Sequence, residues 1–302
     1  MQLGFVSAIV PELSLEQVFD LARQTGYDCV EIMCWPVGKA DRRYAGVTHL
    51  DVTQFSSADA QRVLQLCADK QVRISALGYY PNPLSPDPTV RETAAQHLLK
   101  VIDAAALLGL PVVNTFIGRD PCRLIEDQWD DLKQVWGPIV AHAQQKNIRI
   151  GIEHCPMLFS RDEWPGGKNL AISPAVWRRL FETFPGPTLG LNLDPSHLLW
   201  QMIDVPRVIR EFNERIYHVH AKDARIDPDK LYDWGVTGLM WHTPKLPGLG
   251  DVNWRAFFSA LSDTGYNGPV CVEVEDRSYE KTYDDRKRAL IQSATYLRNF
   301  VV

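Results

Sequence analysis

The sequence predicts a single-domain α/β fold, a closed (β/α)8 barrel (TIM barrel) that takes up residues 1–302. Short apolar runs alternate with longer segments of helical periodicity eight times along the chain. Such strict alternation is typical of parallel strands joined by helical crossovers, and eight units favour a closed barrel. No glycine-rich phosphate loop follows the first strand, so an open doubly wound sheet is the less favoured alternative.

The first half of the chain contains four strand–helix units. Ser14 and Gln17 form a capping box, which predicts that a helix begins there. Gly109 closes the third helix, because glycine readily adopts the left-handed conformation found after helix ends. The expected strands are 3–9, 29–33, 72–77 and 112–116, and the expected helices are 14–23, 58–70, 89–108 and 127–145.

The second half repeats this rhythm. Ser173 followed by Pro174 is the favoured order of cap and proline at a helix start. The expected strands are 148–153, 188–194, 216–220 and 270–275, and further helices are expected at 206–213, 254–263 and 283–300. Two long connections, 155–172 and 221–253, follow strands and therefore fall on the face where barrel enzymes carry their sites.

The composition is that of an ordinary globular protein, with 45% hydrophobic and 23% charged residues and a formal net charge of -5. Nucleic-acid binding depends on clustered lysine and arginine, which this chain lacks. No apolar stretch is long enough to span a bilayer, and no basic signal segment opens the chain. We therefore expect a cytoplasmic protein without a nucleic-acid or membrane partner, whose six scattered cysteines are reduced thiols.

Acidic and histidine side chains end the last four strands in turn. Because strand ends of a barrel converge on its axis, and residues two apart share a face, these side chains are expected to meet. One such residue is more often a cap or loop residue than a ligand, but four in consecutive strands favour a common role. The candidates are Glu153, then Asp194, then His218 and His220, then Glu273 and Glu275.

Three carboxylates at close range stay ionised only when a cation offsets their charge. A divalent metal ion is the simple solution. A mostly oxygen ligand set with one nitrogen suits Mn²⁺, Mg²⁺ or Co²⁺ at least as well as Zn²⁺. We expect one divalent ion per chain, with Mn²⁺ as the first choice.

Several segments of the second half resemble the xylose-isomerase-like superfamily of TIM-barrel sugar phosphate isomerases, epimerases and related lyases. The first half agrees only in its barrel rhythm. Together the segments are specific for the superfamily but not for a substrate. They are Ile-Glu-His-Cys-Pro at 152–156, Leu-Asp-Pro-Ser-His at 193–197, His-Val-His-Ala-Lys-Asp at 218–223, Leu-Pro-Gly-Leu-Gly at 246–250, and Gly-Tyr at 265–266 leading into Val-Glu-Val-Glu-Asp at 272–276.

The resemblance implies that Glu153, Asp194, His220 and Glu273 bind the metal ion, and that Glu153 and Glu273 are also the proton-transferring pair. The similar motif places the ligand at its first glutamate, which favours Glu273. Glu275 shares its face and stays the alternative.

Other residues after strands are candidates for binding the substrate, and each has a structural alternative. His197 can instead cap a turn or support the metal, and Lys222 can be a solvated loop cation. Glu31 can be an inward structural carboxylate. His154 stands where relatives commonly have asparagine, which indicates different substrate contacts, although it can simply pack. The aromatic candidates for stacking on a sugar are Trp35, Tyr79, Tyr80, Trp164 and Trp241, whereas His49, His97 and His142 are expected to be structural or surface residues.

These features predict a divalent-metal-dependent isomerase or epimerase acting on a keto-sugar or sugar derivative. The metal chelates a carbonyl and a neighbouring hydroxyl oxygen, one glutamate removes a carbon-bound proton, and the enediolate is reprotonated on the opposite face or the neighbouring carbon. The alternative is a lyase, either a dehydratase of a keto-polyol or a β-eliminase of a 3-keto-glycoside, because the same start can expel a leaving group. The expected partner is a small sugar, and the resemblance implies a homo-oligomer.

Two other functions are disfavoured. The abasic-site endonucleases of the superfamily need additional histidine ligands after the third and fourth strands, where this chain has Gly78-Tyr79-Tyr80 and Phe116-Ile117-Gly118. A sugar-binding protein without catalysis would have no reason to keep all four metal ligands.

Overall fold

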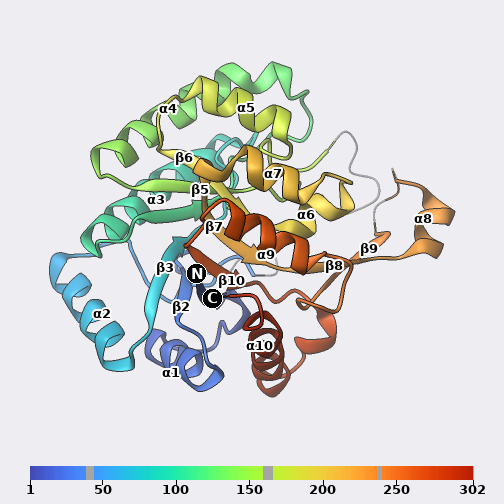
Figure 1. Ribbon diagram of the computed structural model, residues 1–302. Helices are drawn as coiled ribbons and strands as arrows, with labels where there is room; N and C mark the ends of the chain where they lie inside the picture. Colours follow the sequence, from blue (N-terminus) through green and yellow to red (C-terminus); the bar gives the residue numbers. More distant parts are fainter. Residues whose placement is uncertain (39–43, 159–165, 237, 239, 302) are drawn as a thin grey trace.

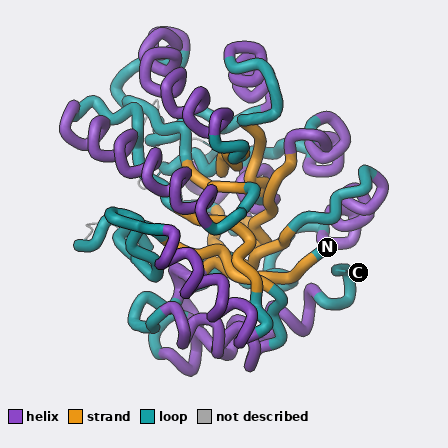
Figure 2. The backbone as a smooth tube through the Cα atoms, turned by 90° about the vertical axis from the view of Figure 1, so that its left-hand side faces the viewer, coloured by secondary structure: helices purple, strands orange, loops and turns teal. Residues whose placement is uncertain are grey.

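The computed structural model describes residues 1–38, 44–158, 166–236, 238 and 240–301. Eight parallel strands close into a barrel, and helices surround it, as Figure 1 and Figure 2 show. The predicted (β/α)8 barrel is therefore confirmed. In barrel order the strands are β1 (Gln2–Val6), β10 (Pro269–Val272), β7 (Ile216–Ala221), β6 (Leu189–Leu193), β5 (Arg149–Glu153), β4 (Val112–Thr115), β3 (Arg73–Gly78) and β2 (Cys29–Met33).

The outer helices begin and end close to the predicted positions. The capping box at Ser14 is present: its hydroxyl accepts from the N–H of Gln17 at 3.3 Å, and its own N–H donates to the Gln17 side chain at 2.8 Å. The crossover helices are α1 (Leu15–Thr25), α2 (Ser57–Lys70), α3 (Pro88–Leu107), α4 (Trp129–Gln145), α5 (Pro174–Thr183), α7 (Val205–Glu211), α9 (Trp254–Asp263) and α10 (Tyr283–Leu297).

Two strands end three residues before their predicted ends. The first was expected to continue to residue 9, but Ser7–Ile9 forms a 3-10 turn in which the N–H of Val10 donates to the carbonyl of Ser7 at 3.0 Å. The eighth was expected to reach residue 275, but β10 ends at Val272. Glu273 follows it and still donates its N–H to the carbonyl of Ala221 at 3.3 Å. The side chain of Glu273 is thus held at the end of the barrel wall.

The structure contains short elements that the sequence pattern did not reveal. A short helix, α6 (Pro195–Trp200), follows β6 directly, with Asp194 as its N-cap. After β7 the chain forms an antiparallel pair, β8 (Asp223–Ile226) with β9 (His242–Lys245), and α8 (Pro228–Trp234) lies between them. This excursion stands out at the right of Figure 1.

The core lies between the barrel and its helices, and its largest fully buried side chains include Trp136, Trp177 and Trp254. All six cysteines are free thiols, as expected. Within the described residues, no helix is both long and apolar enough to cross a membrane.

Candidate active site

The four predicted metal ligands come together at the carboxyl ends of the strands. Glu153 is the last residue of β5, Asp194 follows β6, His220 lies near the end of β7 and Glu273 follows β10. One ligand atom from each lies within 4.8 Å of all the others. Residues separated by up to 120 positions in the sequence therefore form one cluster, as the strand-end pattern indicated.

Asp194 is held by its neighbours. Its N–H donates to Nε2 of His154 at 3.0 Å, and its Oδ1 accepts from the N–H of Ser196 at 2.8 Å. Its Oδ2 is buried and has no hydrogen-bond partner among the described residues, although Nζ of Lys222 lies 3.1 Å away. Burial raises the pKa of Asp194, but the charges of Lys222 and His197 lower it below its usual value. An ionised oxygen thus faces the cluster.

His197 joins two of the acidic ligands. Its Nε2 lies 3.1 Å from Oε1 of Glu153 and 3.3 Å from Oδ2 of Asp194. Its place in the first turn of α6 follows from the Asp-Pro start of that helix. The imidazole can therefore hold the Glu153 carboxylate in position, as a support for the ligands or as a contact to substrate.

Glu31 lies against His220, outside the cluster of four predicted ligands. Its Oε2 is 2.7 Å from Nε2 of His220, and its Oε1 accepts a hydrogen bond from the hydroxyl of Tyr80. Burial raises the pKa of Glu31, but the His220 charge and hydrogen bond lower it to about 2. An ionised carboxylate only accepts hydrogen bonds, so Nε2 of His220 carries the hydrogen. This carboxylate is fully buried against protein groups, and its contact with substrate hydroxyls stays a prediction.

His220 consequently presents its other ring nitrogen to the cluster. Nδ1 is buried without a hydrogen-bond partner among the described residues, and it lies 3.7 Å from Oε2 of Glu273. A histidine that donates one N–H to a carboxylate and offers the other nitrogen to a metal is the usual arrangement in metal sites.

Lys222 is buried among the carboxylates and is not a solvated loop cation. Its Nζ lies 2.5 Å from Oε2 of Glu273, 3.1 Å from Oδ2 of Asp194 and 3.1 Å from Oε2 of Glu275. Burial lowers the pKa of Lys222, but these carboxylates raise it well above its usual value. The protein thus supplies one of the cations that the acidic cluster requires, which the charge argument from sequence had not counted.

Glu273 and Glu275 share a face, as predicted, since both reach Lys222. Burial raises the pKa of Glu273, and the neighbouring Glu275 and Glu153 raise it further against the opposing effect of Lys222. Of these two glutamates, only Glu273 belongs to the cluster with Glu153, Asp194 and His220 that the described residues form.

The donor set fits a divalent ion. Two buried atoms, Oδ2 of Asp194 and Nδ1 of His220, lack hydrogen-bond partners among the described residues, and both belong to the cluster. Ligand atoms at about 2.1 Å from an ion are at most about 4.2 Å apart. The four ligand atoms of the cluster all lie within 4.8 Å of one another, which is close to this spacing.

The ring of His154 lies inside the protein beside the cluster, and its contact with substrate stays a prediction. The ring is fully buried, packs against Trp177 at a centroid distance of 5.1 Å, and accepts the N–H of Asp194. Burial lowers the pKa of His154 to about 3, so it stays neutral and keeps its acceptor nitrogen. The ring thereby fixes the backbone of Asp194.

The other predicted histidines are structural. His49 and His97 are buried against the carbonyls of Val10 and Cys34, at 3.1 and 2.7 Å. His142 lies 2.9 Å from Oδ1 of Asp103 on the outside of the barrel.

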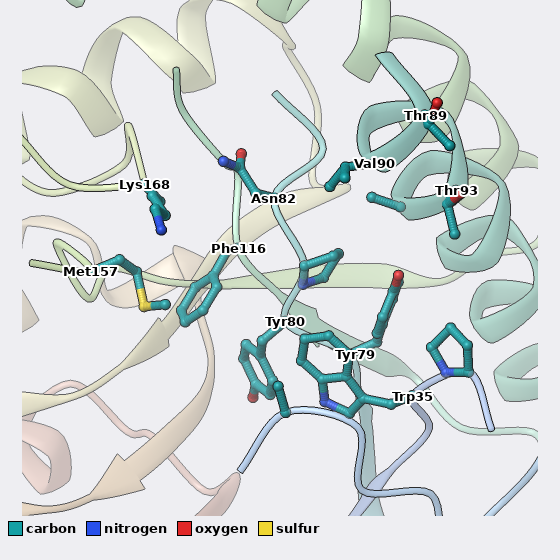
Figure 3. Close-up of a pocket in the computed structure, with 14 residues that line it drawn as sticks. Trp35, Tyr79, Tyr80, Asn82, Thr89, Val90, Thr93, Phe116, Met157 and Lys168 are labelled. Atoms are coloured by element: carbon teal, nitrogen blue, oxygen red, sulfur yellow. The ribbon is translucent and has the colours of Figure 1, made fainter. Parts of the chain in front are cut away.

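The aromatic candidates divide into two groups. Trp35, Tyr79 and Tyr80 line a cavity beside the cluster, which Figure 3 shows. Trp241 is buried and donates its indole N–H to the carbonyl of Val236 at 3.3 Å, so it packs within the β8–β9 excursion. Trp164 lies outside the described residues.

Two residues near the site were missed in the sequence. Asn169 donates its side-chain N–H to the carbonyls of Glu153 at 2.9 Å and Cys155 at 2.8 Å, and so ties the long connection after β5 to the strand end. Cys155 lies close to Glu153 and His197, with potential ligand atoms within 4.8 Å of each other. No sequence motif marked Asn169, because its partners are backbone carbonyls.

The fold and the site together are those of a TIM-barrel protein with acidic residues and a histidine clustered at the carboxyl ends of its strands. The family model described as a xylose isomerase-like TIM barrel matches residues 19–300. The chain therefore belongs to the xylose isomerase-like TIM barrel family.

Individual relatives cover this chain to different extents. The uncharacterized protein YfiH of Bacillus subtilis is 27% identical, over 91% of this chain and 93% of YfiH. An inosose dehydratase of Clostridium perfringens is 32% identical, over 50% of this chain and 49% of the dehydratase. The crystal structure of a D-psicose 3-epimerase from Clostridium cellulolyticum superposes with a TM-score of 0.69 and 14% identity, over 100% of this chain and 99% of that one, which shows a shared fold.

Proposed function

We propose that this chain is a divalent-metal-dependent isomerase or epimerase that moves a proton next to the carbonyl group of a keto-sugar or sugar derivative. The observation that carries the proposal is the meeting of Glu153, Asp194, His220 and Glu273 within 4.8 Å, with buried ligand atoms that lack hydrogen-bond partners among the described residues. Membership of a family with sugar epimerases and dehydratases among its relatives supports the substrate class.

Each residue of the site has its own part in the proposed proton transfer. Glu153, oriented by His197, removes the carbon-bound proton, and Glu273 returns a proton from the other side of the substrate. The buried ammonium of Lys222 lies close to Glu273 and Asp194, where it can bind a substrate oxygen as charge develops. A divalent ion held by the four ligands, with Mn²⁺ as the first choice, would supply positive charge that stabilises the enediolate.

A lyase is the second candidate, and the inosose dehydratase favours it. The 32% identity to that enzyme is higher than the 14% identity to the epimerase, although it extends over half of each chain. The proposed reaction would then begin with the same proton abstraction and end with loss of a neighbouring group, either as the dehydration of a keto-polyol or as β-elimination from a 3-keto-glycoside.

Incubation with keto-sugars and keto-polyols in heavy water tests the proposal. We expect deuterium to enter at the carbon next to the carbonyl, and the exchange to stop when a chelator removes the metal. An isomerase or epimerase leaves the carbon skeleton intact, whereas a lyase releases water or a fragment and forms an enone absorbance. Full exchange in metal-free protein would contradict the proposal.

The fourth ligand can be identified with two matched substitutions. Glu273→Gln is expected to weaken Mn²⁺ binding by more than about 100-fold, the upper range for groups that only support a ligand. Glu275→Gln removes a contact to Lys222 and is expected to weaken binding by less than about tenfold. Titration calorimetry with Mn²⁺ measures both affinities. A larger loss in Glu275→Gln would assign the ligand to Glu275.

Glu31 is expected to set the affinity for the metal through His220. Glu31→Leu removes the acceptor for the Nε2 hydrogen, so we expect Mn²⁺ to bind about 10–100-fold more weakly. Glu31→Gln keeps an acceptor oxygen and is expected to retain more of the affinity. Nitrogen-15 spectra of the histidines in protein loaded with diamagnetic Zn²⁺ report which ring nitrogen of His220 carries the hydrogen. Unchanged affinity and tautomer in Glu31→Leu would refute this role.

A further inference from the structure

A cavity of about 480 Å³ lies beside the metal cluster, over the ends of β2, β3 and β4. It extends to the first turns of α3, and Figure 3 shows the aromatic rings of Trp35, Tyr79, Tyr80 and Phe116 on its wall. Its volume falls in the range of roughly 300–1,000 Å³ typical of pockets that bury drug-sized ligands. The cavity can therefore receive a part of the substrate beyond the reacting carbon atoms.

Tyr80 connects the cavity with the cluster. Its ring lines the cavity, whereas its hydroxyl donates to Glu31 and lies 3.4 Å from Nε2 of His220. Phe116 packs against that ring at a centroid distance of 5.0 Å. The cavity therefore lies one side chain, that of Tyr80, away from His220 of the cluster.

The wall of the cavity offers few partners for hydroxyl groups. No aspartate or glutamate lies among the described residues that line it. The hydroxyl of Tyr80 is bound to Glu31. The amide of Asn82 donates to the carbonyl of Arg119 at 2.8 Å and accepts from the N–H groups of Arg119 and Leu84 at 2.8 and 3.2 Å.

Among the described residues, the remaining polar side-chain groups of the wall are the Trp35 indole N–H, the Tyr79 hydroxyl, the Thr89 and Thr93 hydroxyls on α3, and the Lys168 ammonium. Figure 3 places Lys168 and Met157 on the side of the cavity away from the threonines. Burying a hydroxyl group without a partner is unfavourable, so a second sugar ring, with a hydroxyl on most of its carbons, fits this wall poorly. An aromatic group fits, because it can pack its faces and edges against Trp35, Tyr80 and Phe116.

We propose that the substrate is a keto-sugar ring that carries an aromatic substituent, and that this substituent binds in the cavity beside Tyr80. The inference rests on the proposed function, which places the sugar ring at the metal cluster. It narrows the substrate class from keto-sugars in general to aryl glycosides.

Binding of two unreactive probes to the Mn²⁺-loaded protein tests the inference. Phenyl β-D-glucoside is expected to bind at least about tenfold more tightly than methyl β-D-glucoside, because only the phenyl group buries apolar area in the cavity. Titration calorimetry gives both affinities. Equal affinities, or no binding of either probe at millimolar concentration, would overturn the inference.

Substitutions on α3 test whether the phenyl group binds in the cavity. Val90 lines the cavity and is partly exposed, so Val90→Asp introduces a carboxylate there without disturbing the core. We expect this variant to lose the preference for the phenyl probe. Glu92→Gln changes the charge of the same helix outside the cavity lining and is expected to keep it. A preference that survives Val90→Asp would place the phenyl group elsewhere.

The proposed aromatic substituent and the proposed function can be rejected separately. Loss of the phenyl preference with intact Mn²⁺ binding and deuterium exchange rejects the aromatic substituent alone. A phenyl preference in a protein that exchanges no substrate proton rejects the proposed function and leaves the cavity as a binding site for aryl glycosides.

Discussion

Glu153→Gln is expected to reduce deuterium exchange into a keto-sugar substrate by at least about 10³-fold. The substitution keeps the size of the side chain but removes the group that takes the proton, and it weakens one ligand of the metal. The side chain faces His197 at 3.1 Å, so the amide should stay in place. Exchange is measured by NMR at a Mn²⁺ concentration that saturates the variant, with the bound metal quantified.

The control for this variant is Glu126→Gln, which changes the charge of a largely exposed glutamate on the outside of the barrel. It should exchange at the rate of the unaltered protein. If Glu153→Gln binds the metal and exchanges within tenfold of the unaltered rate, another group is the base, and Glu153 is a ligand only.

Asp223→Ala is expected to lower the free energy of unfolding by about 3 kcal/mol or more, because buried donors lose their acceptor. Oδ1 of Asp223 accepts from the N–H groups of Ala224 at 2.8 Å and Val252 at 3.0 Å. Oδ2 accepts from the N–H of Gly248 at 2.9 Å and the indole N–H of Trp254 at 2.8 Å. This acidic residue of the 218–223 motif thus fastens the β8–β9 excursion to α9.

Chemical denaturation measures this effect. Asp229→Ala, an exposed position in α8, is the control and should change the unfolding free energy by no more than about 0.5 kcal/mol. A shift of similar size in the two variants would mean that the four hydrogen bonds contribute little to folding.

The meeting of the four proposed ligands could be predicted because it depends on a local rule. Side chains that end successive parallel strands point to the same mouth of the barrel, which placed Glu153, Asp194 and the histidines of the seventh strand together. The choice of His220 came from the family resemblance. The same rule gave the shared face of Glu273 and Glu275, since residues two apart in an extended segment point the same way.

The roles of the supporting residues could not be predicted in this way. Glu31 lies 189 positions from His220, and only closure of the barrel between β1 and β10 brings β2 near β7. The sequence left open that Lys222 is a solvated loop cation. In the structure it directly follows β7, and its side chain is buried in the acidic cluster. His154 follows a ligand, yet its ring points to the backbone of the next strand end.

Short elements were missed for a different reason. The strands β8 and β9 have four residues each, too few for an alternating pattern to stand out. Helix α6 is also short, although Asp194 before Pro195 is a cap-then-proline start that could have been recognised.

Anomalous X-ray scattering from crystals grown with Mn²⁺ tests the central claim most directly. We expect one strong anomalous peak per chain, about 2.0–2.3 Å from oxygens of Glu153, Asp194 and Glu273 and from Nδ1 of His220. No peak at saturating Mn²⁺ would contradict the proposed metal site and would mean that Lys222 alone neutralises these carboxylates. A peak away from the four residues would also contradict it.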